Sequence, residues 1–277
     1  MGVIEFATSP WGQTVPVHIS FLLIWVSAIA GLAFLMGHAI WYQVAVKHAA
    51  HAEPAQGEVA ADAAVKVPDT VARHSLAARL FHWIMAAAML ALLVTAFLPK
   101  VGYPFAWVTY HWIAGLVLTA SIIYHIIHAT FFLDPWSIWP DAIDREDALR
   151  RWKRATGESA PAPRKFAKYP LENKMYHLVI VLAGLSVTLT GLFMMKRVRT
   201  PIFTRNPYVF GDMTWGLMYV LHGLAGVGLI ALIMVHIYFA LRPEKLAITR
   251  SMVLGSITRD HFLEHHDPER WAPEPER

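Results

Sequence analysis

The stretch Tyr219–Arg242, "YVLHGLAGVGLIALIMVHIYFALR", is apolar at nearly every position and decides how this chain folds. A helix of roughly 20 apolar residues crosses a bilayer, so the stretch predicts a transmembrane helix. Two histidines, His222 and His236, interrupt it fourteen positions apart. Fourteen residues give about 1400° of turn and about 21 Å of rise. We therefore predict both imidazoles on one helix face, at opposite depths of the membrane.

Four further apolar blocks resemble this one in length. The chain has 277 residues, 56% hydrophobic and 16% charged, whereas soluble proteins average about 25% charged residues. The five blocks cover approximately residues 18–45, 76–98, 108–132, 172–195 and 214–241. They predict an all-α membrane protein with five transmembrane helices. The first block is too long for a signal peptide and has no Lys or Arg before it, so we expect a retained span.

The basic residues predict the orientation of these spans. With the N-terminus outside, nineteen of the twenty-four Lys and Arg residues fall on the inside, as the positive-inside rule requires. The outer segment "KRVRTPIFTR", residues 196–205, opposes the rule and is a candidate docking surface for an acidic partner. On the inside, the Trp-containing charged segment 134–158 predicts an amphipathic helix along the membrane interface.

The composition also excludes several classes of function. Cysteine is absent, which excludes disulfides, thiolate-bound iron–sulfur clusters and covalently attached c-type haem within this chain. No Gly-rich phosphate loop or nucleophile constellation supports a self-contained hydrolase or transferase. The basic residues cluster beside the apolar blocks, which indicates membrane topology and no nucleic-acid partner.

Histidines inside the spans are the candidate functional residues. Polar residues in a membrane are costly and usually functional, although a lone membrane histidine often only bonds a neighbouring helix. Imidazole suits iron, zinc and copper, and haem b held between two imidazoles fits best in a chain without cysteine or obvious carboxylates in the span interiors. The six span histidines fall at two depths, and His111 with His125 repeats the fourteen-residue spacing: they are His82, His111, His125, His177, His222 and His236.

Small and basic residues accompany these histidines. Gly115 follows His111 by four positions, and Gly226 follows His222 by four, so each glycine shares a helix face with its histidine. A missing side chain there lets a flat porphyrin approach, although small residues also serve helix packing. Arg79, one turn before His82, is a candidate partner of a haem propionate. The alternative for Arg79 is an interfacial anchor.

Several motifs together resemble a known family. They are "RLFHW", "HWIAG", "KYPLENKMYHL", "LHGLAG…VHIYFALR" and the tail "SMVLGSITRDHFLEHHDPERW". Over about residues 73–271 the chain resembles the membrane cytochrome b (gamma) subunit of respiratory formate dehydrogenase, within the bacterial cytochrome b561 and hydrogenase cytochrome b group. The resemblance implies a four-helix dihaem core (73–245). The first apolar block is then an addition to the family core, so we expect an extra N-terminal helix (1–46), a cytoplasmic linker (47–72) and a cytoplasmic tail (246–277).

The resemblance also implies cofactors and ligands. It implies two haem b groups in the bacterial inner membrane, where the orientation predicted from the basic residues corresponds to a periplasmic N-terminus and a cytoplasmic C-terminus. The outer haem would be held by His111 with His222, and the inner one by His82 with His236. His125 is an alternative inner ligand, because it matches His111 by spacing as well as His236 matches His222. The tail histidines, His261, His265 and His266, are expected at the surface or beside a haem propionate.

The implied role is electron transfer between partner subunits and quinone. The expected partners are a periplasmic iron–sulfur subunit and a molybdenum or tungsten catalytic subunit, with menaquinone or ubiquinone near the inner face. The expected quinone or proton region comprises Lys168, Tyr169, Asn173 and His177, although Pro170 stands where relatives commonly have Asn. The alternatives are the cytochrome b subunit of a hydrogenase, a thiosulfate reductase or another molybdoenzyme, and a haem-free membrane anchor or transporter.

Overall fold

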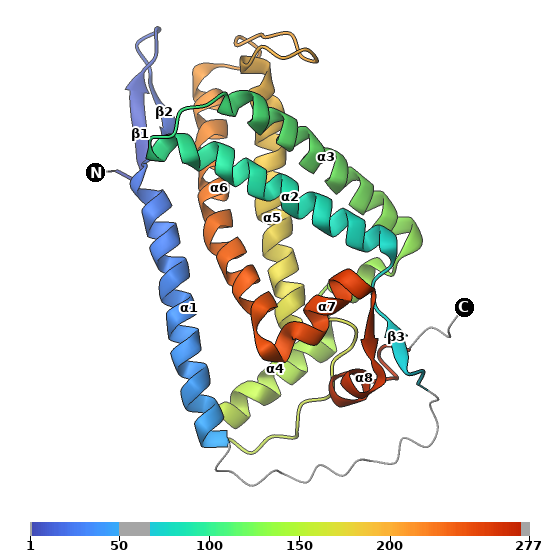
Figure 1. Ribbon diagram of the computed structural model, residues 1–277. Coiled ribbons are helices and arrows are strands. Elements are labelled where there is room, and N and C mark those ends of the chain that lie inside the picture. The colour runs from blue at the N-terminus through green and yellow to red at the C-terminus, as the bar shows by residue number, and fades with distance from the viewer. Residues whose placement is uncertain (1, 50–66, 273–277) are drawn as a thin grey trace. The chain divides into compact units, whose positions relative to one another are not determined.

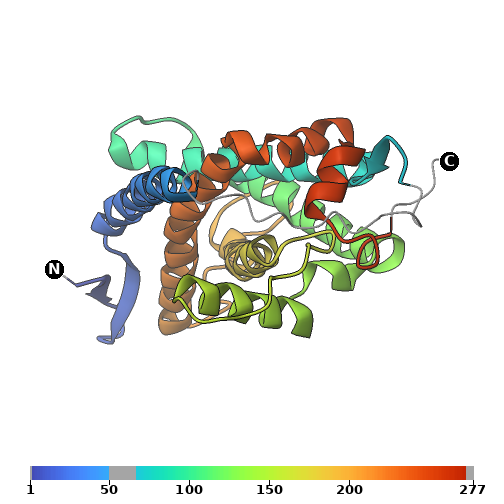
Figure 2. The same cartoon turned by 90° about the horizontal axis from the view of Figure 1, so that it is seen from below.

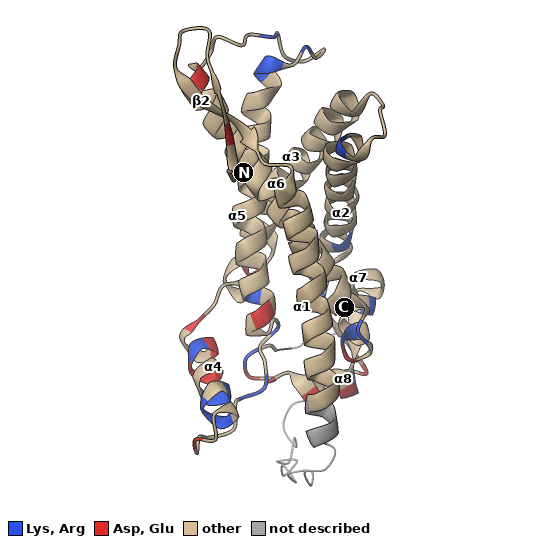
Figure 3. Ribbon diagram, turned by 90° about the vertical axis from the view of Figure 1, so that its left-hand side faces the viewer, with Lys and Arg blue, Asp and Glu red and all other residues tan. Residues whose placement is uncertain are grey.

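Five long helices dominate the protein. A computed structural model describes residues 2–49 and 67–272 (Figure 1). Within these residues five helices are long and apolar enough to cross a membrane, and charged residues lie toward their ends (Figure 3). Helices suit this role because they satisfy their backbone polar groups internally. The predicted five-span all-α fold is confirmed, with α1 (Leu22–Ala49), α2 (Leu76–Phe97), α3 (Trp107–Phe132), α5 (Leu171–Met194) and α6 (Asp212–Leu241).

The chain packs as two compact units. The first comprises Met1–Gly37, Leu80–Ile127 and Ile180–Tyr238. The second comprises His38–Arg79, His128–Val179 and Phe239–Arg277. Every long helix contributes residues to both units. Short 3₁₀ turns extend or follow several of them, at η1 (Leu98–Val101), η2 (Pro135–Ile138), η3 (Met195–Arg197) and η4 (Pro243–Lys245).

A β-hairpin precedes the first long helix. Strands β1 (Ile4–Thr8) and β2 (Thr14–Ile19) pair antiparallel, and Gly12 in the turn has φ +78°, which glycine adopts without strain. The sequence reading, which began the first span near residue 18, was wrong by about four residues. The missed signal is the alternation of apolar and polar residues on both sides of the turn sequence "SPWGQ", which is typical of a hairpin.

Helix α6 contacts both the hairpin and α1 in the first unit. The Ser27 hydroxyl donates to the Val227 carbonyl at 2.7 Å, and the two helices lie side by side (Figures 1 and 2). A Cβ added to Gly216 would stand 1.9 Å from the Pro16 carbonyl oxygen. Glycine is therefore required where β2 crosses α6, because any side chain would collide with backbone.

The second unit includes a small domain built from distant segments. Strand β3 (Thr70–Ala72) pairs antiparallel with β4 (Ser256–Thr258). Helix α7 (Leu246–Leu254) precedes β4, and α8 (Arg259–His265) follows it. The apolar core of this domain consists of Val67, Val71, Ile257 and Phe262, with Leu263 and Trp271 packed against it. The chain just before α2 is thereby joined to the tail after α6.

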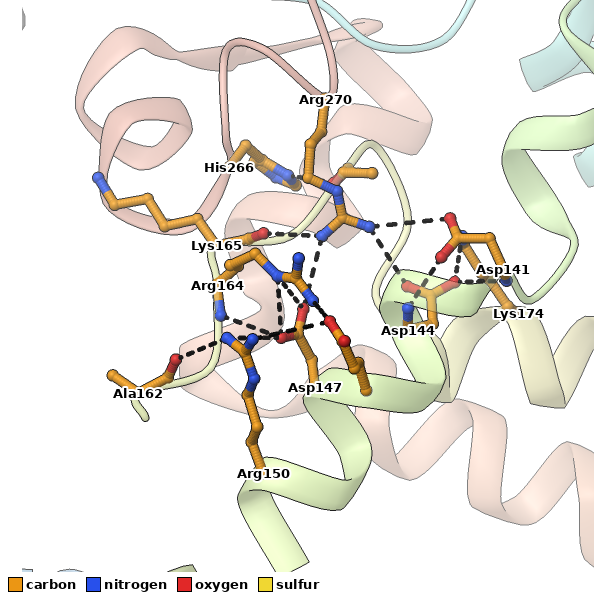
Figure 4. Close-up of polar contacts among 12 residues, drawn as sticks. Asp141, Asp144, Asp147, Arg150, Ala162, Arg164, Lys165, Lys174, His266 and Arg270 are labelled. Atoms are coloured by element: carbon orange, nitrogen blue, oxygen red, sulfur yellow. Dashed lines mark hydrogen bonds and ion pairs between the residues drawn. The ribbon is translucent and has the colours of Figure 1, made fainter. Parts of the chain in front are cut away.

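An ion-pair network joins α4 (Ala142–Ala155) to the start of α5 and to the tail (Figure 4). The segment predicted to form an amphipathic helix is helical at α4, which begins with a capping box between Asp141 and Asp144. Lys174 Nζ lies 2.6 Å from Asp144 Oδ2, and both side chains are buried. The Arg270 guanidinium reaches Asp144 and Asp147 at 3.6 and 3.8 Å.

Candidate functional site

Two pairs of histidines face each other in the first unit. The rings of His111 on α3 and His222 on α6 have centroids 6.2 Å apart. The rings of His82 on α2 and His236 on α6 also have centroids 6.2 Å apart. Helix α6 thus provides one histidine to each pair, because the fourteen-residue spacing brings both imidazoles to one side of the helix.

The ring separations match coordination of one metal ion by two imidazoles. A metal–nitrogen bond is about 2 Å, and the ring centre lies about 1 Å beyond the nitrogen, so two rings bound to one metal have centroids about 6 Å apart. Both pairs meet this requirement. Among the described residues no group of three or more His, Cys, Asp or Glu could hold a metal. Two imidazoles would be enough to hold a metal whose remaining ligands come from a macrocycle, as in haem.

His125, the alternative ligand, lies against a different residue. Its ring stacks on Phe81 with a centroid distance of 4.3 Å and an interplanar angle of 8°. The ring that His236 faces belongs to His82. The structure therefore brings together the two pairs that the family resemblance named, and it sets His125 against an aromatic neighbour.

Two threonines that sequence reasoning missed contact the His111–His222 pair. Thr95 Oγ1 lies 2.8 Å from His111 Nδ1, and Thr190 Oγ1 lies 3.0 Å from His222 Nδ1. Beside Thr190, a Cβ added to Gly191 would stand 3.3 Å from His222 Cε1, so glycine gives the ring its space. The only signal in the sequence was a polar residue inside an apolar span, which is expected to have a function or a partner.

The predicted glycines have open surroundings. The nearest atom to a Cβ added at Gly115 would be Leu92 Cδ2 at 3.9 Å, and at Gly226 it would be Phe97 Cζ at 4.0 Å. Close helix packing places protein much nearer, as at Gly223 on the same helix, where Ile19 comes within 3.0 Å. Gly115 and Gly226 therefore leave room beside the His111–His222 pair, as a flat macrocycle requires.

Arg79 lies in the second unit. Its Nη1 donates to the Val253 carbonyl near the end of α7, and its guanidinium lies 3.2 Å from the position that a Cβ on Gly255 would take. Gly255 has φ +91° and ends α7 as a left-handed cap, which is the usual role of glycine at this position. Arg79 thus binds a helix C-terminus, where a cation is favourable.

The residues of the expected quinone region lie in the second unit. The ring of His177 meets Trp139 edge-on at 6.1 Å, and Asn173 is half-buried in the first turn of α5. Lys168 Nζ lies over the Tyr169 ring, 5.7 Å from its centroid. Burial raises the pKa of the Tyr169 phenol, although the Arg73 cation opposes the shift.

A buried cluster connects this region to the tail. The Arg73 guanidinium is 3% exposed and donates from Nη2 to the Lys168 carbonyl at 2.9 Å. The His266 ring is 1% exposed, which corrects the expectation of a surface tail histidine. His266 Nδ1 donates to the Ala167 carbonyl at 2.7 Å, so Nε2 accepts from Arg73 Nη1 at 3.3 Å. Burial lowers the His266 pKa to about 4, so the ring stays neutral near pH 7.

Long apolar helices that carry facing imidazole pairs define a multi-pass membrane protein of the cytochrome b class. Residues 73–255 match the family model described as prokaryotic cytochrome b561, and the chain belongs to this family. No curated protein matches the chain. The family match begins at Arg73 and ends at Gly255, two residues whose backbones are hydrogen-bonded at 2.8 Å. Because this family binds haem b, the protein is a membrane cytochrome b that transfers electrons.

Proposed function

We propose that this chain is a dihaem cytochrome b subunit that carries electrons between a periplasmic iron–sulfur partner and the quinone pool. His111 with His222 would hold one haem b, and His82 with His236 would hold the other. The observation that supports this assignment is the 6.2 Å ring separation in both pairs. Each haem iron supplies a one-electron carrier when bound.

The residues of the chain itself orient and isolate the two carriers. The two histidines on α6 are separated by about 21 Å of helix rise, so they would hold the two carriers at different depths. Gly115 and Gly226 leave the sides of the His111–His222 pair accessible to a flat group. The surrounding spans are apolar by composition, so in a bilayer they would exclude water from the imidazoles, and such burial is one of the factors that set a haem reduction potential.

The basic residues after α5 support a partner on the outer side. In the described part of the chain, none of the basic residues between 196 and 205 pairs with a carboxylate. Aromatic rings hold two of them instead, because Lys196 lies over Phe203 and Arg197 lies over Trp215. Uncompensated positive charge attracts an acidic partner. We therefore propose that this loop docks an acidic iron–sulfur subunit of a formate-dehydrogenase-like enzyme, with the N-terminus periplasmic.

Quinone would react near the start of α5. The candidates are Lys168, Tyr169, Asn173 and His177, which all belong to the second unit. A phenol, an ammonium and an imidazole are groups that donate hydrogen bonds to quinone oxygens or exchange protons. Replacement of Tyr169 by Phe is expected to slow quinol-dependent haem reduction without changing haem content. Unchanged kinetics in Tyr169→Phe would remove this residue from the site.

Haem content is the decisive test of the proposed ligands. Membranes that contain the protein should show a b-type reduced-minus-oxidised spectrum, and the purified chain should bind two haems. His222→Ala and His82→Ala should each lose one haem, and His125→Ala should retain both as the matched control on α3. A chain purified without haem would contradict the function. Loss of haem from His125→Ala with retention in His82→Ala would reassign the ligand of the second pair.

The catalytic partner is tested separately. Isolation of the intact complex from native membranes should co-purify a molybdenum or tungsten subunit with an iron–sulfur subunit. A nickel hydrogenase or a thiosulfate reductase in its place would change the partner and leave the haem assignment intact. Neutralising Lys196, Arg197 and Arg199 together should loosen the complex, most strongly at low ionic strength, because added salt screens the electrostatic attraction in the wild type as well.

A further inference from the structure

The hydrogen bonds at Thr95 and Thr190 determine which nitrogen of each histidine carries the proton. Thr95 Oγ1 lies 2.7 Å from the Ala91 carbonyl oxygen, and Thr190 Oγ1 makes the same contact with the carbonyl of Ser186, four residues earlier. Two oxygens approach this closely only when a hydrogen lies between them, and a carbonyl has none to give. Each threonine hydroxyl is therefore the donor in this contact.

Each threonine hydroxyl therefore donates its one proton to a backbone carbonyl, and the hydroxyl oxygen can only accept a hydrogen bond from the histidine. His111 Nδ1–H donates to Thr95 at 2.8 Å, and His222 Nδ1–H donates to Thr190 at 3.0 Å. An imidazole protonated at Nδ1 has its lone pair at Nε2. Both histidines of this pair are consequently held in the tautomer that coordinates a metal through Nε2.

The two threonines are placed in the same way on different helices. Thr95 on α2 bonds a histidine on α3, and Thr190 on α5 bonds a histidine on α6. Both are buried, at 5% and 9% exposure. Among the described residues, His82 of the other pair has no such threonine contact.

We propose that Thr95 and Thr190 are positioning residues that orient the His111–His222 pair and lower the reduction potential of the haem it holds. This inference rests on the proposed ligation of haem by that pair. A hydrogen bond from Nδ1–H to an oxygen increases the negative charge on the imidazole and strengthens it as a ligand. A stronger donor stabilises ferric iron more than ferrous iron, so the potential falls. Second-shell hydrogen bonding is one of the ways in which proteins adjust haem potentials.

Conservative variants separate this role from packing. Thr95→Val and Thr190→Val keep the branched shape and remove the acceptor, whereas Thr95→Ser and Thr190→Ser keep it. Thr119→Val is the matched control, because the Thr119 hydroxyl donates to the Gly115 carbonyl at 2.7 Å on α3 and makes no histidine contact among the described residues. The readouts are haem content and the midpoint potential of each haem, by redox titration of the purified protein.

Wild-type protein and His222→Ala are measured first. If the wild type binds no haem at this pair, the proposed function fails before the threonines are tested. If it binds two haems, the one missing from His222→Ala identifies the potential to follow. Each valine variant should then raise the equilibrium constant for reduction of that haem by roughly two- to tenfold, which is the range expected for the loss of one hydrogen bond. A tenfold change corresponds to an upward shift of about 59 mV in the midpoint potential for one electron.

The inference is supported if this haem alone shifts upward or is lost in the valine variants and if serine restores the wild-type value. An unchanged potential in both valine variants would overturn it. It would also be overturned by equal shifts of the two haems, by an effect of Thr119→Val as large as that of Thr95→Val, or by serine variants that behave like valine variants.

Discussion

The two units bury polar groups in opposite ways. In the first, histidine and threonine form neutral hydrogen bonds, and its single ion pair among the described residues joins His18 and Glu5 on the exposed hairpin. All other ion pairs of the described residues belong to the second unit. Neutral pairs are tolerated in hydrocarbon, whereas buried charges require compensating partners. The first unit is therefore suited to hold a cofactor in the membrane, and the second to hold the tail by charge.

The largest loss of stability is expected from a substitution that removes a compensating charge from the second unit. Lys174→Met leaves the buried Asp144 without its 2.6 Å partner, and breaking a buried pair costs about 3–5 kcal/mol. We expect a large loss of thermal stability, measured as the melting temperature of the purified protein. Lys245→Met is the control, because its 3.7 Å pair with Glu172 is solvent-exposed and contributes less than about 1 kcal/mol. Equal effects of the two variants would refute the importance of burial.

A steric substitution should disrupt the contact between the hairpin and α6 in the first unit without altering any charge. Gly216→Ala forces a Cβ into the Pro16 carbonyl, and overpacking of this kind costs about 1–3 kcal/mol. We expect the β1–β2 hairpin to separate from α6, which hydrogen exchange of the residue 4–19 amides would detect. Gly228→Ala on the same helix meets nothing within 4 Å and should stabilise the helix slightly. Protected hairpin amides in Gly216→Ala would contradict the contact.

Acid should weaken the second unit. Burial lowers the pKa of His266 to about 4, whereas the unfolded residue titrates near pH 6.5. Between these values the unfolded state binds the extra proton, so stability falls as the pH drops, by about 1–2 kcal/mol from pH 6.5 to pH 5. Hydrogen exchange of residues 256–266 at the two pH values measures the change. His266→Gln should reduce the pH dependence, and the remainder is expected from His261, whose pKa burial also lowers. An undiminished pH dependence in His266→Gln would assign the effect to another group.

The smallest effect concerns the contact between α1 and α6. Ser27→Ala removes a hydrogen bond to the Val227 carbonyl, which is worth about 1 kcal/mol. The expected result is a small decrease in melting temperature with no change in haem content, because α1 lies outside the family match. Loss of haem from Ser27→Ala would show that the extra helix supports the cofactor site directly.

The sequence predicted the spans well because their signal is local. Apolar runs near Leu76, Trp107, Leu171 and Asp212 are long enough to identify a helix without knowledge of its neighbours. The hairpin at residues 4–19 and the pairing of β3 with β4 were not predicted. The hairpin has short strands, and β3 with β4 joins segments nearly two hundred residues apart. Pairing at that separation leaves no periodic pattern.

The site was predictable to the level of residue type and depth. The fourteen-residue spacing of His222 and His236 placed two imidazoles on one face, and the glycines after His111 and His222 marked the adjacent surface. Spacing alone could not choose between His82 and His125, because both lie at suitable depths on neighbouring spans. Their rings differ only in what they face, which is His236 for one and Phe81 for the other.

The sequence by itself determined that the chain has five apolar helices and that four of them carry histidines at two depths, because hydropathy and helical periodicity act over a few turns. Tertiary structure alone decided which histidines face each other, which threonines accept hydrogen bonds from their Nδ1–H groups, and which charges hold the tail. These are contacts between side chains on different helices. They depend on the rotation and packing of each helix about its neighbours, which no single helical segment encodes.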